Sequence, residues 1–356
     1  MRGVLIGLAI FLAVILVAVL GFKLYDYIAS YEFYNNSNVV FKTPGVDDSN
    51  FVPQGMTYIE EKETFLFAGY MGKPILGNLG DDASRVYVRN ANGDVTFTRL
   101  LNADGTHYTG HSGGVDYFGD YVYVSNEDNR GLDVFLADDI LSGKSETKML
   151  GTVKTYNAPA FCYTFSAENG EKYILAGSFH KDDSVYLTPD HEKITTPAGD
   201  KNTSVMTVFK LSESAELGVE STPVAIISAR EMVQGICMTP DGQLVISSSW
   251  GLARSNLLFY DLSKVQCTEG YTYKGTISYP TNDGKGDDEF EFANISLYYL
   301  DSSCLVNTVK APPMSEELVC LDGRIIVFCE SACNKYVFGK LTTGYDIYGY
   351  NYETID

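Results

Sequence analysis

The sequence predicts an all-β domain, a five-bladed β-propeller, behind one apolar N-terminal helix. Three observations support this prediction. The first is an uninterrupted apolar run from Val4 to Phe22. The second is that no long amphipathic helical pattern follows this run, where short apolar stretches alternate instead with Gly, Asn and Asp. The third is a strand–turn–strand pattern that recurs five times along the chain.

The apolar run is long enough to cross a bilayer. At about 1.5 Å of rise per residue, a helix of this length spans about 28 Å, close to the ~30 Å hydrocarbon core of a membrane. A cleavable signal peptide has a shorter apolar region and a small-residue cleavage site, and Phe22 to Tyr27 offers no convincing site. We therefore expect residues 1–30 to form an uncleaved transmembrane signal anchor with a juxtamembrane segment. A cleaved signal peptide is the alternative.

Residues 31–356 are expected to form one extracytoplasmic propeller domain. Arg2 before the apolar run is matched by Lys23 after it, so the flanking charges say little about orientation. A large domain that follows a first apolar segment is translocated largely regardless of charge. The sequence thus predicts a single-pass protein of the cell membrane with the bulk of its chain extracytoplasmic.

The net negative charge of the chain excludes some classes of binding partner. The chain has 46 acidic residues against 26 basic ones, a net charge of −20, spread along its length. Such a charge repels nucleic acid and anionic lipid headgroups, so we expect no nucleic-acid partner and membrane contact only through the helix. The seven cysteines include no C-x-x-C pair, and mostly free, buried thiols are expected. Disulfides between Cys304 and Cys320, or between Cys329 and Cys333, are the alternative in an oxidising compartment.

Each of the five repeats has a small-residue lead-in, a short apolar strand, a turn and a second strand. The gap between repeats leaves room for two more strands, which makes each unit the size of a propeller blade. A polar, Gly-rich insertion near Asn282 to Asp288 is expected to be a surface loop. The repeats begin at Pro53, His111, Phe161, Val233 and Ser315.

The last repeat lacks an outer strand of its own. Asp346 to Tyr350 supplies a third strand, and no fourth strand follows it. Asn38 to Lys42 precedes the first repeat in the place that a fourth strand normally takes. Pairing these two segments would close the ring and leave no free sheet edge, so we expect them to be neighbours.

Two sets of polar and aromatic residues are expected at one end of the central channel. The lead-in to each inner strand and the loop after each second strand lie at the same end of a propeller. Convergent polar groups in a concave place predict a binding site, to which we assign Gln54, His111, Gln234, Trp250 and Arg254. The lead-ins also contribute Glu316, and the loops also contribute Tyr70, Asn126, Glu127, His180, Glu330 and Lys335. The turns at the opposite end are expected to be ordinary solvated hairpin tips.

Structural roles for the same residues stay open at this point. Gln54 and Gln234 also suit strand ends, and His111 suits a hydrogen bond to neighbouring backbone. Trp250 could pack between blades, and Glu316 could pair with Arg254 or Lys335. No cofactor is expected, because the chain has no Asp-rich calcium loop, and the alternative is a structural Ca²⁺ ion in the channel held by Glu316 and Glu317.

Two phrases of the sequence resemble a known family. Phe51 to Tyr58 followed by Ala68 to Tyr70, and Val233 to Gly235 followed by Ser248 to Leu257, are similar to the plant-type glutaminyl cyclotransferase-like propellers. Pro312 to Glu316, with Phe328 to Ala332, resembles uncharacterised secreted or anchored propellers of Gram-positive bacteria. The third repeat departs from the family pattern, because it lacks the Gln-Gly pair.

The resemblance implies five blades and, if the activity is shared, an enzyme acting on the N-terminal Gln of peptides. In that case Glu316 or Glu330 would shuttle the proton, and Lys335 or Arg254 would polarise the amide carbonyl. The other function class is a binding or scaffolding module whose channel face takes a peptide, a glycan or a small ligand. Binding is our first hypothesis, and the sequence leaves open whether the protein is an enzyme.

Overall fold

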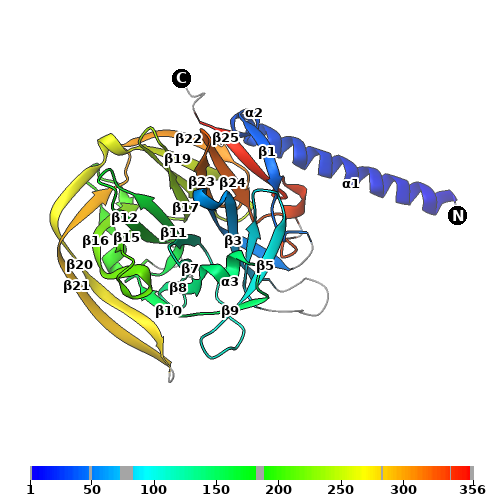
Figure 1. Cartoon of the computed structure of the whole chain (residues 1–356). Coiled ribbons are helices and arrows are strands. Elements are labelled where there is room, and N and C mark those ends of the chain that lie inside the picture. The colour runs from blue at the N-terminus through cyan, green and yellow to red at the C-terminus, as the bar shows by residue number, and fades with distance from the viewer. Residues whose placement is uncertain are drawn as a thin grey trace.

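Five sheets, each built on an antiparallel four-stranded blade, surround a central axis, and one long helix projects away from this ring (Figure 1). The computed structural model describes residues 2–47, 50–72, 83–181, 188–281, 284–336 and 338–352. Each sheet contains a four-stranded blade whose innermost strand lies nearest the axis. The prediction of an all-β, five-bladed propeller behind one N-terminal apolar helix is therefore confirmed.

The first two blades are linked by a short strand that crosses from one to the other. After blade 2 has formed its third strand, helix α3 (Ala137–Leu141) leads the chain back to pair with the edge of blade 1. Blade 1 consists of β2 (Phe51–Ile59), β3 (Thr64–Met71), β4 (Arg85–Arg89) and β5 (Val95–Leu101), with β9 (Glu146–Lys148) added in parallel. Blade 2 consists of β6 (Val115–Phe118), β7 (Tyr121–Asn126), β8 (Gly131–Leu136) and β10 (Gly151–Lys154).

The third and fourth blades follow the same antiparallel order. Blade 3 consists of β11 (Pro159–Ser166), β12 (Lys172–Ser178), β15 (Ser204–Leu211) and β16 (Val219–Ala229). A small ribbon of β13 (Ile194–Thr195) and β14 (Lys201–Asn202) precedes β15. Blade 4 consists of β17 (Val233–Met238), β18 (Gln243–Ser248), β19 (Ser255–Asp261) and β22 (Leu305–Ala311).

The insertion between the last two strands of blade 4 is a long hairpin, so the expected surface loop was wrong. It consists of β20 (Gln266–Thr281) and β21 (Gly284–Tyr299), and β21 runs parallel to β16 at the outer edge of blade 3 (Figure 1). Phe290 and Phe292 alternate with acidic residues, so one face of the hairpin is apolar. Both rings contact Tyr156, at centroid distances of 5.3 and 4.6 Å. Residues 282–283 of the insertion lie outside the described residues.

The fifth blade joins the two ends of the domain, as predicted. It consists of β23 (Ser315–Leu321), β24 (Arg324–Cys329), β25 (Asp346–Asn351) and β1 (Ser37–Lys42). Strand β1 pairs antiparallel with β25, with Asn38 opposite Gly349 and Lys42 opposite Asp346. The N-terminal strand thus covers an edge that would otherwise be free to pair with another chain.

The hydrophobic core lies between the blades. In β24, Ile325 and Val327 belong to the cluster shared with blade 4, whereas Ile326 and Phe328 belong to the cluster shared with blade 1. Because successive side chains of a strand point to opposite faces, a run of consecutive apolar residues fills both interfaces at once. All seven cysteines are free, and five of them are buried.

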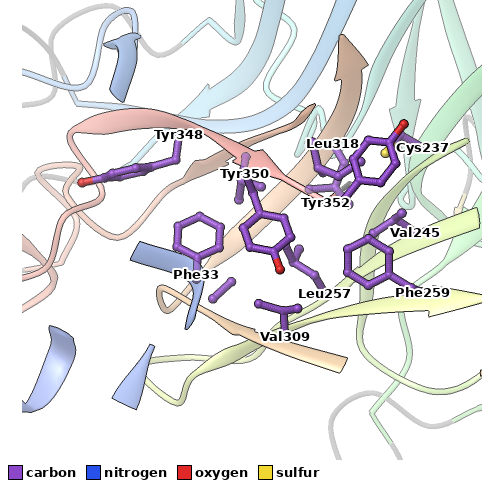
Figure 2. Packing of buried hydrophobic residues seen from close by; sticks show 13 residues of the cluster. Phe33, Cys237, Val245, Leu257, Phe259, Val309, Leu318, Tyr348, Tyr350 and Tyr352 are labelled. Atoms are coloured by element: carbon purple, nitrogen blue, oxygen red, sulfur yellow. The ribbon is translucent and has the colours of Figure 1, made fainter. Parts of the chain in front are cut away.

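Helix α1 (Arg2–Ala29) leads directly into the propeller. The helix Val4–Ala29 contains an 18-residue window with a mean hydropathy of 3.2, none of which is buried, so by length and composition the helix could span a membrane. Helix α2 (Tyr31–Asn35) follows and places the fully buried Phe33 against blades 4 and 5. Figure 2 shows Phe33 beside Tyr350, with ring centroids 5.6 Å apart and nearly parallel planes. The chain is therefore attached to the propeller immediately after the apolar helix.

Candidate functional site

The inner strands are irregular at the end of the channel where the sequence predicts the site. The pairing register shifts at Gln54 in β2, at Ala160 in β11 and at Gln234 in β17. In β23 it shifts across Glu316 and Glu317. A bulge takes a residue out of the regular ladder and changes the direction of its side chain. Four of the five blades thus present an irregular inner-strand position near the axis.

These positions border a cavity of about 340 Å³ at one end of the channel, which we call the channel pocket. It brings together most of the residues that the sequence predicted for a binding face. Lys335, from the loop after β24, lies here with Glu316 and Glu330, the other two residues expected to act if the protein is an enzyme. The predicted residues that line it are Gln54, Tyr70, His111, Glu127, Gln234, Trp250, Glu316, Glu330 and Lys335.

Three predicted residues do not line the pocket. Arg254 was wrongly placed there, because its guanidinium forms a buried ion pair with Asp26 near the end of α1. Asn126 instead donates a hydrogen bond to Asp133 at 2.8 Å. The ring of His180 lies 2.9 Å from a carboxylate oxygen of Glu192.

Sequence reasoning missed Phe179 and Tyr336, which also line the pocket. Tyr336 donates a hydrogen bond of 2.9 Å to Glu330 Oε1, and the Phe179 ring lies 5.7 Å from that of Trp250. Each is the sequence neighbour of a residue that had been predicted, His180 and Lys335. This position next to a predicted residue was the only sequence signal for Phe179 and Tyr336.

A continuous hydrogen-bond chain occupies one side of the pocket. Gln54 donates through Nε2 to Glu330 at 2.7 Å, and its Oε1 lies 2.8 Å from His111 Nε2. The other ring nitrogen of His111 lies 2.8 Å from Glu127 Oε1. Burial opposes ionisation of Glu127, but the hydrogen bond and positive charge of His111 outweigh burial and lower the pKa of Glu127. The polar groups on this side are therefore already partnered by protein.

Lys335 is held by aromatic residues on the same side. Its ammonium donates a hydrogen bond to the Tyr70 hydroxyl and lies 5.0 Å from the Tyr70 ring and 5.1 Å from the Tyr336 ring. Burial raises the pKa of Tyr70, and the negative charge of Glu330 raises it further. Lys335 is exposed, and these contacts place its positive charge near Glu330.

Glu316 is the exception in this pocket. The residue is only 1 % exposed, and its buried Oε1 has no hydrogen-bond partner among the residues that the structure describes. Burial raises the pKa of Glu316 well above its ordinary value, and the nearby charges of Glu330 and Glu317 add to this effect. The predicted pairing with Arg254 or Lys335 does not occur. A buried polar group without a partner is costly, so Glu316 is the least stabilised group of the site.

Two further residues line the cavity beside Glu316. Gln234, on the adjacent inner strand, is half-buried, and its side-chain amide forms no hydrogen bond within the described ranges. Trp250, in the loop between β18 and β19, is 42 % exposed and does not pack between blades. The ammonium of Lys181 lies 5.0 Å from its ring. A carboxyl, an amide and an indole thus face the same cavity.

Glu317 separates the two ends of the channel. Its carboxylate accepts N–H bonds from Met56 at 2.8 Å, Val115 at 3.1 Å and Cys162 at 3.0 Å, which belong to three different blades. Burial raises its pKa, and these three bonds oppose that rise. Both carboxylate oxygens of Glu317, one of the two residues considered for a Ca²⁺ ion, therefore accept hydrogen bonds from the backbone. Within the described ranges, no group of three or more His, Cys, Asp or Glu is arranged to hold a metal.

Two glycines of the inner strands fit this crowded axis. A Cβ on Gly55 would lie 2.6 Å from the backbone nitrogen of Val115, and a Cβ on Gly235 would lie 2.4 Å from the Cα of Glu317. Real side chains do not approach backbone so closely. Gly55 and Gly235 are therefore required by the close approach of the inner strands.

The opposite end of the channel holds a larger cavity, of about 630 Å³, whose lining includes the exposed turn residues Glu61 and Asp322. Asp116 lies in its wall and accepts hydrogen bonds from the Thr57 hydroxyl and from the backbone N–H groups of Tyr117 and Thr164. The Tyr163 hydroxyl accepts the N–H of Met238. These buried polar groups of the larger cavity have protein partners. We therefore regard the smaller channel pocket as the better candidate site despite the difference in volume.

The comparisons with known proteins found only distant similarities. No protein family and no curated protein matches the sequence. Among solved structures, a luciferin-regenerating enzyme is 12% identical, with a TM-score of 0.41 over 88% of this chain and 95% of the other. A GH43 β-xylosidase/α-arabinofuranosidase from a compost microbial metagenome is 13% identical, with a TM-score of 0.44 over 88% and 93%. The aldose sugar dehydrogenase of Streptomyces coelicolor is 11% identical, with a TM-score of 0.41 over 88% and 96%.

Similarities this low carry no argument about what the chain binds or catalyses. They are also no support for the resemblance to glutaminyl cyclotransferases. The function has to be argued from the channel pocket itself.

Proposed function

We propose that this protein is a membrane-anchored binding module that takes a small ligand, or the end of a peptide or glycan, into the channel pocket. The observation that carries the proposal is Glu316, a buried carboxyl that lines a cavity and whose Oε1 has no hydrogen-bond partner among the described residues. Buried polar groups in folded proteins are nearly always hydrogen-bonded. A ligand that bonds to Glu316 would supply the partner that the protein does not.

The remainder of the pocket suits recognition. A cavity of about 340 Å³ falls in the usual range for small-molecule sites. Trp250 offers an exposed aromatic face at its rim, which suits stacking against a ring or an apolar group. The chain of Gln54, His111 and Glu127 fixes the opposite wall, so little reorganisation would be needed on binding.

Anchoring is the second part of the proposal. Helix α1 is long and apolar enough to cross a bilayer, and α2 docks on the propeller directly after it. The helix would hold the propeller at the extracytoplasmic surface of the cell membrane. The membrane is then a partner of the helix alone, and the acidic propeller remains in solution.

The alternative, a glutaminyl cyclotransferase-like enzyme acting on N-terminal Gln, has no observation in its favour. One of the two cations considered for the amide carbonyl, Arg254, is ion-paired with Asp26. Glu316, Glu330 and Lys335 line the pocket, so acid–base groups are available there.

The test uses Trp250 as a reporter, since it is the only tryptophan of the chain. The full-length protein in detergent is titrated with panels of peptides, oligosaccharides and small polar molecules, and the tryptophan emission is followed. We expect at least one class to change the emission in a saturable manner, and Glu316→Gln to weaken that effect. Glu61→Gln, the same chemical change at the opposite end of the channel, is the control. If no class alters the emission of the wild-type protein, the proposal is wrong.

A further inference from the structure

The polar groups of the channel pocket are divided unequally between its two sides. On one side, Glu330 accepts hydrogen bonds from Gln54 and Tyr336 and lies near the ammonium of Lys335. On the other side, Glu316 has neither a hydrogen bond nor an ion pair within the described ranges. The pocket therefore contains two buried carboxyl groups and one resident ammonium, and that ammonium is held next to Tyr70.

A positive charge is what the Glu316 side lacks. A buried carboxylate is stable only when it is paired with a cation or accepts several hydrogen bonds. The groups that surround Glu316 are Glu330, Glu317, Lys335, Tyr70 and Cys329. Among them only Lys335 is a cation. Its positive charge lowers the pKa of Glu316 by less than burial and the two acidic neighbours raise it. These surroundings therefore favour the protonated form of Glu316, and a second cation nearby would favour its carboxylate.

The neighbours of Glu316 also fit a cation. The Gln234 side chain is half-buried beside it and offers an amide oxygen that can accept from a second N–H group. The Trp250 ring already carries the Lys181 ammonium at 5.0 Å, which shows that its position is compatible with a nearby positive charge. Phe179, 5.7 Å from Trp250, adds apolar surface for the organic part of a ligand.

We propose that the channel pocket selects small organic ammonium ligands, with a primary amine placed between Glu316 and Gln234 and its apolar part against Trp250 and Phe179. This inference rests on the proposed binding function and specifies its ligand class. Binding couples to one proton: the incoming ammonium keeps its own protons, and the Glu316 carboxyl releases its proton to the buffer as the ion pair forms. A neutral polyol would bind to protonated Glu316 without this release.

The experiment compares ligands that differ only in charge. Full-length protein in detergent is titrated with benzylammonium and benzyl alcohol, and with 1,4-diaminobutane and butane-1,4-diol, with protein-free micelles as the blank. Trp250 emission reports occupancy, and calorimetry in two buffers of different ionisation enthalpy counts the protons released. We expect each ammonium to bind at least about tenfold more tightly than its alcohol, with a proton release that the alcohols do not produce.

The variants separate charge from shape. Glu316→Gln keeps the size of the side chain, and we expect it to abolish proton release and to weaken ammonium binding at least about tenfold. Gln234→Leu should weaken binding but leave the proton release intact, and Glu61→Gln should change neither. If an alcohol binds as tightly as its ammonium, or Glu316→Gln retains the proton release, the ammonium inference is wrong while ligand binding at the pocket stands. If no ammonium changes the emission, the inference is also wrong, and the wider panels above decide the proposed function separately.

Discussion

Glu316 and Glu317 are neighbours on β23 with opposite surroundings. The Glu317 carboxylate accepts three backbone N–H groups from three blades, whereas the Glu316 carboxyl accepts none within the described ranges. Both side chains are almost fully buried. One of the pair therefore joins the blades at the axis, and the other remains available to a ligand.

This difference predicts opposite effects of the same substitution. Glu317→Gln places an amide NH₂ where backbone N–H groups now donate, so we expect a loss of about 2–4 kcal/mol in the free energy of unfolding. Glu316→Gln removes no protein contact and should change the stability by less than about 1 kcal/mol. Urea unfolding of both variants, followed by circular dichroism, measures the two values. Equal losses would show that Glu316 has a structural partner as well.

Asp116 predicts a pH dependence of stability. Burial raises its pKa from 3.8 to about 6, although Thr164, Tyr117 and Thr57 donate hydrogen bonds to it. The folded state therefore keeps this proton over a pH range in which the unfolded state has lost it. The contribution of Asp116 to stability is present at low pH and is lost as the pH rises through about 6.

Asp116→Asn removes this titration and keeps a group of the same shape. Between about pH 5 and pH 8, the wild-type protein should lose about 1–1.5 kcal/mol more stability than the variant. Urea unfolding at the two pH values provides the comparison. A pH dependence that is unchanged by the substitution would mean that Asp116 titrates in its ordinary range.

The ion pair between Arg254 and Asp26 predicts how firmly α1 is held on the propeller. Both side chains are nearly buried, and Asp26 also accepts a hydrogen bond of 2.8 Å from the Tyr34 hydroxyl. Arg254→Met or Asp26→Asn alone leaves a buried charge unpaired and should cost about 3 kcal/mol. The double variant should cost less than the sum of the two. Melting in detergent measures all three, and strictly additive losses would show that the two groups do not interact.

The pairing of β1 with β25 predicts different outcomes for two truncations. Deleting residues 36–43 removes the outer strand of blade 5 and exposes β25 as a free edge, so this variant should aggregate or unfold without a sharp transition. Deleting residues 1–30 removes Asp26 but keeps β1 and Phe33, and should leave a folded, soluble propeller. The two variants are compared by melting and by size-exclusion chromatography. Identical behaviour would mean that ring closure by β1 adds little to stability.

Much of the fold could be predicted because its signals are local. Repeated apolar strands and turns give the five blades, and the unmatched segments at Asn38 and Ile347 predict the closure of the ring. The β20–β21 hairpin was missed because its Gly-rich tip masked the alternation of Phe290 and Phe292 with acidic residues. That period of two was the available signal for strands.

The sequence predicted which position of each blade lies at the site, but not the contacts of each side chain. Repeat alignment correctly brought Gln54, Gln234 and Glu316 to one pocket, because equivalent strand positions lie at the same end of the channel. It failed for Arg254, whose partner Asp26 is 228 residues away and belongs to no repeat. It also gave no means of knowing that Gln54 is partnered and Glu316 is not, since that depends on side-chain contacts between blades.

The most direct test of our central claim, that the channel pocket holds a ligand, is to fill the pocket without removing any polar group. Ala160 lines it from the inner strand of blade 3, and Ala160→Phe would occupy its volume. For whichever ligand class saturates the Trp250 emission of the wild-type protein, we predict that Ala160→Phe abolishes saturation while its melting transition stays sharp. Glu61→Gln should titrate like the wild type. Unchanged ligand affinity in a folded Ala160→Phe variant would contradict the account and place the site elsewhere.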